Sequence, residues 1–348
     1  MNCHFIGGEK MFHIYNRRYV GSKYKLMPWI KELIDEHCEG TTLFDVFAGT
    51  GVVSDFLLED YEEFYINDFL FSNEIIYNAF FLNEQYDFNK LLEIEKNYNN
   101  ILVSKIRDNY FSKNFGDKFF SKQDSKIIGY IRENLKRKLS KKELNYKEYC
   151  ILLASLLYSM DRSANTVGHY DAFFQKASIK PNFKFELIEP RNIGNKKIHI
   201  FRRDSNELVK EIKADIAFID PPYNSRQYSR FYHVLENITQ WKKPALTGTA
   251  MKPPAENMSE YCRSSAPEVF DDLIQNLNVK YIVVTYNNTY NSKSNSSRNK
   301  ILLEEIETSL KKKGTTQIFE MPYRFFNAGK TDLEEHKELV FITKVGDK

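Results

Sequence analysis

Cysteine is scarce in this chain of 348 residues, and its four cysteines are scattered: Cys3, Cys38, Cys150 and Cys262. They form no C-x-x-C pair, which argues against both a zinc site and a disulfide framework. Apolar runs stay short of the roughly 18 residues that a membrane-spanning helix needs, and the N-terminus lacks the apolar core of a signal peptide. These absences predict a soluble, cytoplasmic chain with no resident metal.

Aromatic residues, by contrast, make up 15% of the chain, which is too many for a disordered protein. The length suffices to bury a full core, and we expect one α/β domain with a second lobe. The first ten residues precede the first motif, and Met11 would serve equally well as a start. We therefore expect this segment to be dispensable.

The most informative motif is Asp220-Pro221-Pro222-Tyr223. It follows the apolar run 216–219, which predicts a buried strand that the prolines end. Ligands of open α/β sheets bind at this end of the strands. A carboxylate and backbone carbonyls accept hydrogen bonds from an exocyclic amine, and Tyr223 offers a face on which a base can stack. The group suits a flipped nucleobase whose amino group reacts, although the motif alone also fits a strand that ends in a proline-rich turn.

A glycine turn lies far upstream. Residues 43–51 combine a short apolar strand, which contains Asp45, with Phe47, Gly49 and Gly51. The glycines allow a tight turn and a close approach of backbone to a ligand. A strand, a glycine turn and a helix open a nucleotide-binding α/β unit, although G-x-G also occurs in ordinary turns.

A second strand near 64–67 ends at Asp68, an acid placed to hold the two hydroxyls of a ribose. A dinucleotide motif would have a third glycine where this chain has Ser54. A ribose-containing ligand without phosphates therefore fits better, and S-adenosylmethionine is one.

Lys23 follows a glycine and a serine just before the amphipathic stretch 26–34. A P-loop would need glycines at the positions of Arg17 and Ser22, so this G-S-K is not a phosphate-binding loop. Near a helix start, Lys23 could neutralise the carboxylate of a ligand. A surface lysine after a turn is the alternative, and alone it would be preferred.

Taken in order, Y-V-G-S-K, F-D-V-F-A-G-T-G, I-N-D and D-P-P-Y resemble the adenine-specific DNA methyltransferases of the Dam-like group, also called the α or D12 class. The stretches 164–171 and 220–233 resemble most closely the branch that contains the NlaIII and FokI modification enzymes. The resemblance runs from about Arg18 to the C-terminus. It implies methyl transfer from S-adenosylmethionine to N6 of a flipped adenine in double-stranded DNA, as the modification enzyme of a restriction-modification system.

The resemblance also implies residue roles. Lys23 would lie near the cofactor carboxylate, Asp68 would bind the ribose, and Asp204 would contact the adenine edge of the cofactor. The implied catalytic residues are Asp220, Pro221, Pro222 and Tyr223. The implied cofactor-binding residues are Tyr19, Lys23, Asp45, Phe47, Gly49, Gly51, Asp68, Asp204, Ser205 and Asp220. Tyr19 stands where the family often has tryptophan, and it keeps an aromatic face.

The expected fold is α/β, a Rossmann-like S-adenosylmethionine-dependent methyltransferase fold with a mostly parallel seven-stranded sheet and a C-terminal antiparallel hairpin. Strands are expected near 43–47, 64–67, 198–201, 216–219, 281–285, 316–320 and 339–344. Residues 11–85 and 191–348 would form the catalytic domain. Residues 86–190 would form an inserted, mainly helical target-recognition domain, with its clearest buried helix at 151–160. Residues 242–262 and 287–299 are expected to be irregular.

Basic residues are concentrated between Ser104 and Lys147, a stretch with 13 lysines and arginines but only 5 acidic residues. The net charge of the whole chain, by comparison, is only +3. Such a patch can bind DNA phosphates, and within a suspected DNA enzyme we favour this interpretation over a solvated helix face. The candidate DNA contacts are Lys136, Arg137, Lys138, Lys141, Lys142, Asn165, His169, Tyr170 and Arg226. For His169, a structural role is the default.

Three other functions remain open. A cytosine-N4 methyltransferase would use similar chemistry but usually has serine at position 220. An RNA guanine-N2 methyltransferase generally lacks the Lys23 motif and a large insertion. A non-catalytic DNA-binding module is disfavoured by the acids at 68 and 220. A separately encoded restriction endonuclease is a candidate partner, no membrane contact is expected, and the chain is expected to be a monomer or weak dimer.

Overall fold

The computed structural model of this chain describes residues 11–175, 178–288, 298–322 and 337–346. The chain divides into two compact units. The sheet unit comprises residues 21–74, 193–236 and 254–348, and the helical unit comprises residues 1–20, 75–192 and 237–253. The helical unit therefore begins before residue 86 and takes in two segments outside 86–190. The assignment of one unit to catalysis and the other to target recognition stays a prediction.

The sheet unit is built on seven strands in the order β3-β2-β1-β4-β5-β7-β6. The strands are β1 (Thr42–Asp45), β2 (Glu63–Asn67), β3 (Lys197–Phe201), β4 (Ile216–Ile219), β5 (Tyr281–Asn287), β6 (Gly314–Pro322) and β7 (Lys337–Val345). Strands β1 to β5 pair in parallel, whereas β7 runs antiparallel to both β5 and β6. The expected seven-stranded sheet with a C-terminal antiparallel hairpin is confirmed.

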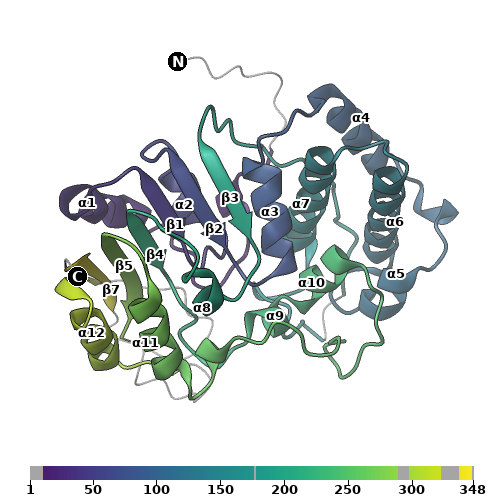
Figure 1. Cartoon of the computed structure of the whole chain (residues 1–348). Helices are drawn as coiled ribbons and strands as arrows, with labels where there is room; N and C mark the ends of the chain where they lie inside the picture. The colour runs from purple at the N-terminus through teal and green to yellow at the C-terminus, as the bar shows by residue number, and fades with distance from the viewer. Residues whose placement is uncertain (1–10, 176–177, 289–297, 323–336, 347–348) are drawn as a thin grey trace. The chain divides into compact units, whose positions relative to one another are not determined.

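The central strands β4 and β5 are buried along almost their whole length because helices cover both faces of the sheet. The core on one face includes Phe44, Ile219 and Phe270, and α8, α11 and α12 contribute to it. Helices α1 and α2 lie on the other face (Figure 1). The helices that begin in this unit are α1 (Met27–His37), α2 (Val52–Phe56), α3 (Phe71–Phe81), α8 (Ser205–Leu208), α9 (Tyr228–Phe231), α10 (His233–Gln240), α11 (Ala266–Asn276) and α12 (Leu303–Lys311).

The helical unit is centred on α7, whose residues are almost all buried, as expected for 151–160. Its helices are α4 (Phe88–Asn99), α5 (Tyr110–Phe115), α6 (Lys122–Ser140) and α7 (Tyr146–Ser163), and α3 and α10 continue into it from the sheet unit. Short 3-10 helices complete the elements of the described residues: η1 (Ile14–Asn16) and η2 (Val103–Lys105) in this unit and η3 (Glu260–Cys262) in the sheet unit.

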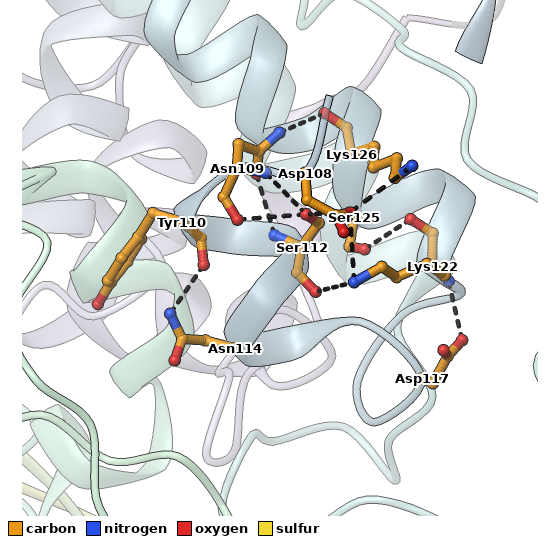
Figure 2. A network of polar contacts seen from close by, with 9 residues as sticks. All are labelled: Asp108, Asn109, Tyr110, Ser112, Asn114, Asp117, Lys122, Ser125 and Lys126. Atoms are coloured by element: carbon orange, nitrogen blue, oxygen red, sulfur yellow. Dashed lines mark hydrogen bonds and ion pairs between the residues drawn. The ribbon is translucent and has the colours of Figure 1, made fainter. Parts of the chain in front are cut away.

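Helices α5 and α6 are joined by a polar network (Figure 2). The Asn109 side chain accepts a hydrogen bond from the backbone of Ser112 at 3.0 Å, which caps α5, and donates one to the carbonyl of Lys126 on α6 at 2.9 Å. Gly129 permits this approach, since a Cβ there would lie 2.2 Å from Oδ1 of Asn109. The corner is therefore fixed by side-chain contacts rather than by loop length.

The irregular segments expected from the sequence are partly confirmed. Residues 242–259 contain no helix or strand, and η3 forms the end of that stretch. Most of 287–299, like the first ten residues, lies outside the described residues.

Candidate active site

The strand order brings distant residues to one edge of the sheet. Strands β1, β2 and β4 are adjacent and parallel, so their carboxyl ends lie side by side. Gly49 follows β1, Asp68 follows β2 and Asp220 follows β4. The strand order reverses between β1 and β4, the position at which open α/β sheets bind ligands.

The turn after β1 requires its glycines. Gly49 has φ of 54° and Gly51 has φ of 77°, both in the left-handed region that favours glycine. Gly51 also directly precedes α2. The turn is held to the next strand because Ala48 donates a backbone hydrogen bond to the carbonyl of Asn67 at 2.8 Å.

Asp68 links this glycine turn to α3. Its carboxylate accepts hydrogen bonds from the backbone of Gly49 at 3.0 Å and of Leu70 at 2.8 Å, and the Asn73 side chain is a further donor. Burial raises the pKa of the Asp68 carboxyl, and the hydrogen bonds partly oppose this.

Glu236 on α10 supports the same region. Its carboxylate accepts hydrogen bonds from the backbone of Ser72 at 2.8 Å and of Phe71 at 3.0 Å, which satisfies free N–H groups at the start of α3. Burial raises the pKa of Glu236 to about 7. The position of Asp68 therefore depends on an acid far away in the sequence.

Asp45 is the most deeply buried acid of the sheet edge, with an exposed fraction of 1%. Its Oδ2 accepts a hydrogen bond from the Ser54 hydroxyl at 2.7 Å, whereas Oδ1 has no partner among the described residues. Burial raises the pKa of Asp45 to about 7, and the nearby carboxylates of Asp220 and Asp68 add to this effect. The structure thus places Asp45 beneath the glycine turn, out of reach of direct ligand contact.

Asp220 receives donors from three separate segments of the chain. Lys23 Nζ lies 2.8 Å from Oδ2, and the Thr285 hydroxyl donates to Oδ1 at 2.9 Å. The Tyr223 hydroxyl also donates to Oδ1. Burial and the negative charge of Asp220 raise the pKa of Tyr223 well above its ordinary value, so the phenol stays protonated and remains a donor.

Lys23 is buried and keeps capacity for a further acceptor. Its ammonium donates to Asp220 and, at 3.2 Å, to the carbonyl of Gly21, which uses two of its three N–H bonds. The ammonium also lies 4.9 Å from the centre of the Tyr223 ring. The expected contact with a cofactor carboxylate is compatible with this arrangement, but the partner that the structure shows is Asp220.

The segment after Asp220 is held in place along its length. The Tyr223 carbonyl accepts a hydrogen bond from the backbone of Lys300 at 2.8 Å. The ring of Tyr223 packs edge-on against that of Tyr286, with the ring centres 4.6 Å apart. The Gln227 side chain pairs with both backbone groups of Ser259, at 2.7 and 2.8 Å. The motif is therefore preorganised rather than part of a loose loop.

The chemistry of this edge fits a cofactor with positive charge and hydroxyl donors. Three carboxylates, of Asp45, Asp68 and Asp220, gather there, and Lys23 contacts Asp220. A sulfonium or ammonium group would balance the excess negative charge, and the ribose hydroxyls would find an acceptor in Asp68. The left-handed glycines leave room for close approach to the backbone.

Comparison with known proteins agrees with this geometry. The family of D12 class N6 adenine-specific DNA methyltransferases matches residues 19–290. The chain belongs to this family. The family resemblance inferred from the four motifs is thereby confirmed.

Individual relatives extend the match over most of the chain. Identity is 32% with the modification methylase StsI of Streptococcus sanguinis, over 92% of this chain and 50% of the relative. Identity is 30% with the type II methyltransferase M.FokI of Planomicrobium okeanokoites, over 93% of this chain and 52% of the relative. Identity is 28% with the type II methyltransferase M.NlaIII of Neisseria lactamica, over 92% of this chain and 95% of the relative. The chain thus spans about half the length of StsI and M.FokI and nearly all of M.NlaIII.

The remaining cofactor-binding residues implied by the family resemblance differ in their burial and contacts. Phe47 packs edge-on against Tyr261 at 5.0 Å, and Asp204 is exposed and caps α8 through the backbone of Asn206 at 2.9 Å. Ser205 is buried, and its hydroxyl donates to the carbonyl of Val46 at 3.4 Å. Tyr19 belongs to the helical unit. The cofactor roles of these residues stay predictions.

The basic candidates occupy the end of α6 and the turn that follows it. Lys136, Lys141 and Lys142 are exposed, whereas Arg137 and Lys138 both pair with Glu143 at 3.2 Å. Basic side chains also interact favourably with a helix C-terminus, so their position alone does not demand DNA. Arg226, in the sheet unit, is half-buried, with its guanidinium 5.7 Å from the centre of the Phe231 ring.

The loop after α7 differs from the expectation at Tyr170. This residue is 2% exposed, and its hydroxyl donates to Asp161 at 2.9 Å, so it anchors the loop instead of facing a ligand. Asn165 donates to the carbonyls of Lys118 and Phe174, at 2.9 and 3.0 Å, and closes the loop. His169 is half-buried, and its Nδ1 accepts from the backbone of Asp171 at 3.3 Å.

Several supporting residues escaped the sequence analysis, among them Thr285, Tyr286, Gln227 and Glu236. Thr285, Tyr286 and Glu236 lie outside the motifs quoted above, and Gln227 lies in the stretch 220–233, to which no such role was given. The available signal for Thr285 was its position at the end of the strand expected near 281–285. Glu236 and Gln227 contact backbone groups of distant segments, and a single sequence carries no sign of such contacts.

The described residues add two plain findings. None of the described helices is long and apolar enough to cross a membrane. Within the same described part of the chain, no group of three or more histidine, cysteine, aspartate and glutamate side chains is arranged to hold a metal ion.

The raised pKa of Asp45 predicts pH-dependent stability. Its folded-state value of about 7 exceeds the unfolded value of about 3.9, so ionisation disfavours the folded state. This stability is present at acidic pH and decreases as the pH rises from about 4 through 7. Asp45→Asn removes the ionisation, so its stability relative to wild type should improve by about 2.6 kcal/mol between pH 5 and pH 8. Urea unfolding at both pH values measures this change.

Asp215 provides a matched control at the opposite end of β4. Hydrogen bonds from Lys280, Thr41 and Thr42 outweigh its burial and lower its pKa to about 2, so it is ionised in both states from pH 5 to pH 8. Asp215→Asn should therefore cost the same stability at both pH values. If the stability change caused by Asp45→Asn were also the same at pH 5 and pH 8, the raised pKa assigned to Asp45 would be contradicted.

Proposed function

We propose that this chain transfers a methyl group from S-adenosylmethionine to N6 of a flipped adenine in double-stranded DNA. The observation that carries the proposal is the Asp220 motif at the carboxyl end of β4, beside the glycine turn of β1 and Asp68. Membership of the D12 class supports adenine as the target. The printed names of the relatives, which are modification methylases and type II methyltransferases, support a role in restriction-modification.

S-adenosylmethionine supplies an electrophilic methyl group on a sulfonium. Lys23 would bind its carboxylate with the remaining N–H, Asp68 would accept hydrogen bonds from its ribose, and the glycine turn would surround its methionine part. Asp204 is proposed at its adenine end, in line with the family pattern. Phe47 and Ser205 would complete the wall of the pocket.

The adenine amine is a poor nucleophile because its lone pair is delocalised into the ring. Oδ2 of Asp220 and a carbonyl of Pro221 or Pro222 would accept the two N6 protons and draw the nitrogen toward tetrahedral geometry. These acceptors also stabilise the positive charge that develops on the nitrogen. Asp220 acts as an electrostatic partner rather than a general base, and the surplus proton leaves to solvent afterwards.

The expected partner is double-stranded DNA, with a separately encoded restriction endonuclease as the companion enzyme. The exposed lysines at the end of α6 are proposed to contact phosphates, which would add affinity without reading sequence. Tyr170 is not included, since it is buried.

Removal of Asp220 tests the reaction. Asp220→Ala should lower methyl transfer to DNA by more than about 100-fold, the scale for loss of one preorganised electrostatic partner. The measurement is transfer of radiolabelled methyl groups, followed by nucleoside analysis that separates N6-methyladenine from N4-methylcytosine and methylated guanine. Asp215→Asn, at the other end of the same strand, is the control and should keep its rate at a permissive temperature. Near-wild-type turnover by Asp220→Ala would overturn the assignment.

Cofactor binding is tested at Lys23 and Asp68. Each alanine substitution removes a charge-assisted hydrogen bond worth roughly 1.5–3 kcal/mol, so affinity for S-adenosylmethionine should fall about 10- to 100-fold. Titration calorimetry measures this in the absence of DNA. Lys25→Ala, which changes an exposed lysine two positions along, should leave the affinity unaltered. Unchanged affinity in both test variants would place the cofactor elsewhere.

The basic end of α6 is tested by DNA binding across a salt series. Replacement of Lys136, Lys141 and Lys142 by glutamine should weaken binding to cognate and non-cognate duplexes alike. The salt slope of log affinity should become shallower by about 0.9 for each of these lysines that binds a phosphate in the wild type. Calorimetry with S-adenosylmethionine should show no change.

A matched triple variant controls for net charge. Lys197, Lys213 and Lys280 are exposed and lie at the amino ends of β3, β4 and β5, away from the edge that carries Asp220. Their glutamine variant should keep the wild-type slope. Equal slopes for wild type and both variants would mean that the α6 lysines are merely solvated.

A further inference from the structure

Thr285 occupies an unusual place for a threonine inside a sheet. It is 2% exposed and lies on β5, the strand that pairs in parallel with β4. Its hydroxyl donates to Oδ1 of Asp220 at 2.9 Å. The polar group of a buried strand residue is thus directed at the carboxylate on which the proposed reaction depends.

The register of the sheet fixes this contact. Ile219, the last residue of β4, pairs with Val284, so Asp220 and Thr285 are the next residues along the two neighbouring strands. On its other side Thr285 pairs with Val340 of β7. A β-branched side chain has few χ1 rotamers, and the strand between two partners cannot shift, so the hydroxyl is held in one place.

The hydrogen-bond donors around Asp220 are distributed unequally between its two carboxylate oxygens. Oδ1 accepts from both Thr285 and Tyr223, whereas Oδ2 accepts from Lys23. Since each carboxylate oxygen offers about two acceptor sites, these contacts fill Oδ1 and leave one site on Oδ2. The adenine amine therefore has one oxygen of Asp220 available to it.

We propose that Thr285 is a positioning residue for methyl transfer, which fixes Oδ1 of Asp220 so that the open site of Oδ2 faces the target amine. The inference rests on the function proposed above. The χ2 torsion of aspartate is broad, so rotamer preference alone does not set where the two oxygens lie. Tyr223 supplies the second donor to Oδ1, and Tyr286 supports Tyr223 through a ring contact at 4.6 Å.

Two substitutions of Thr285 separate the effect of its hydroxyl donor from the effect of its packing. Thr285→Val keeps the β-branched shape but removes the donor, and Thr285→Ser keeps the donor but removes the methyl group. Thr285→Val should lower kcat for DNA methylation roughly tenfold or more, the scale for loss of a hydrogen bond to a charged group. Its KM for S-adenosylmethionine and its DNA affinity should stay within about twofold of wild type. Thr285→Ser should recover most of kcat.

Thr343 on β7 supplies a matched control. It is fully buried in the same sheet, and its hydroxyl pairs with that of Thr316 at 2.9 Å, remote in sequence and strand order from Asp220. Thr343→Val removes a comparable buried hydroxyl and should leave kcat unchanged. Melting temperatures of all variants are recorded, so that a loss of kcat is compared among folded proteins.

Each outcome of these experiments either supports or overturns the positioning role of Thr285 or the proposed function. A fall in kcat for Thr285→Val with rescue by Thr285→Ser supports the positioning role. Wild-type kcat in Thr285→Val, or an equal fall in the serine variant, would overturn it, since the hydroxyl would then have no role or packing would account for the effect. A wild type that methylates no nucleic acid would instead overturn the proposed function, while a wild type that methylates cytosine would still test Thr285 on that base.

Discussion

Parallel pairing of β1 with both β2 and β4 is the constraint from which the candidate site follows. Parallel strands end at the same edge, so residues separated by most of the chain come within hydrogen-bonding distance there. The strand order reverses between β1 and the central strand β4, which is the position at which open α/β sheets bind their ligands. Strand β7 lies next to β5 and runs antiparallel to it, so its carboxyl end lies at the opposite edge, and β6 completes the sheet.

This arrangement creates an electrostatic problem that the structure solves only in part. The carboxylates of Asp68 and Asp220 raise the pKa of the buried Asp45, and Lys23 contacts Asp220. Asp68 is stabilised by backbone donors, and Asp220 by Lys23 and two hydroxyls. Asp45 keeps an unpartnered oxygen and a pKa of about 7. The remaining negative potential favours a positively charged ligand, which is the property that connects the fold to the proposed cofactor.

The sequence predicted the sheet well because its signals are local. Short apolar runs bounded by glycine, proline and acids identify strands, and the structure confirms seven of them. Asp68 and Asp220 were also located, since each directly follows a strand. Their hydrogen-bond partners were not, because the contact of Asp220 with Thr285 depends on the register of two strands and that of Glu236 with α3 depends on helix packing. Tyr170 was misjudged for a related reason, since an aromatic residue in a polar loop gives no sign that its ring will be buried.

Preorganisation joins these observations. The segment after β4 begins with Asp220 and two prolines and is then held by contacts with Lys300 and Tyr286 and by the pairing of Gln227 with Ser259. None of these contacts touches the proposed reacting atoms, yet each limits the positions that Tyr223 and Asp220 can adopt. An electrostatic partner is effective when it needs no rearrangement as charge develops, and a carboxylate held by three donors meets that condition. We therefore expect the rate of the proposed transfer to depend on hydroxyl and amide groups that restrict the position of this carboxylate without contacting the reacting atoms.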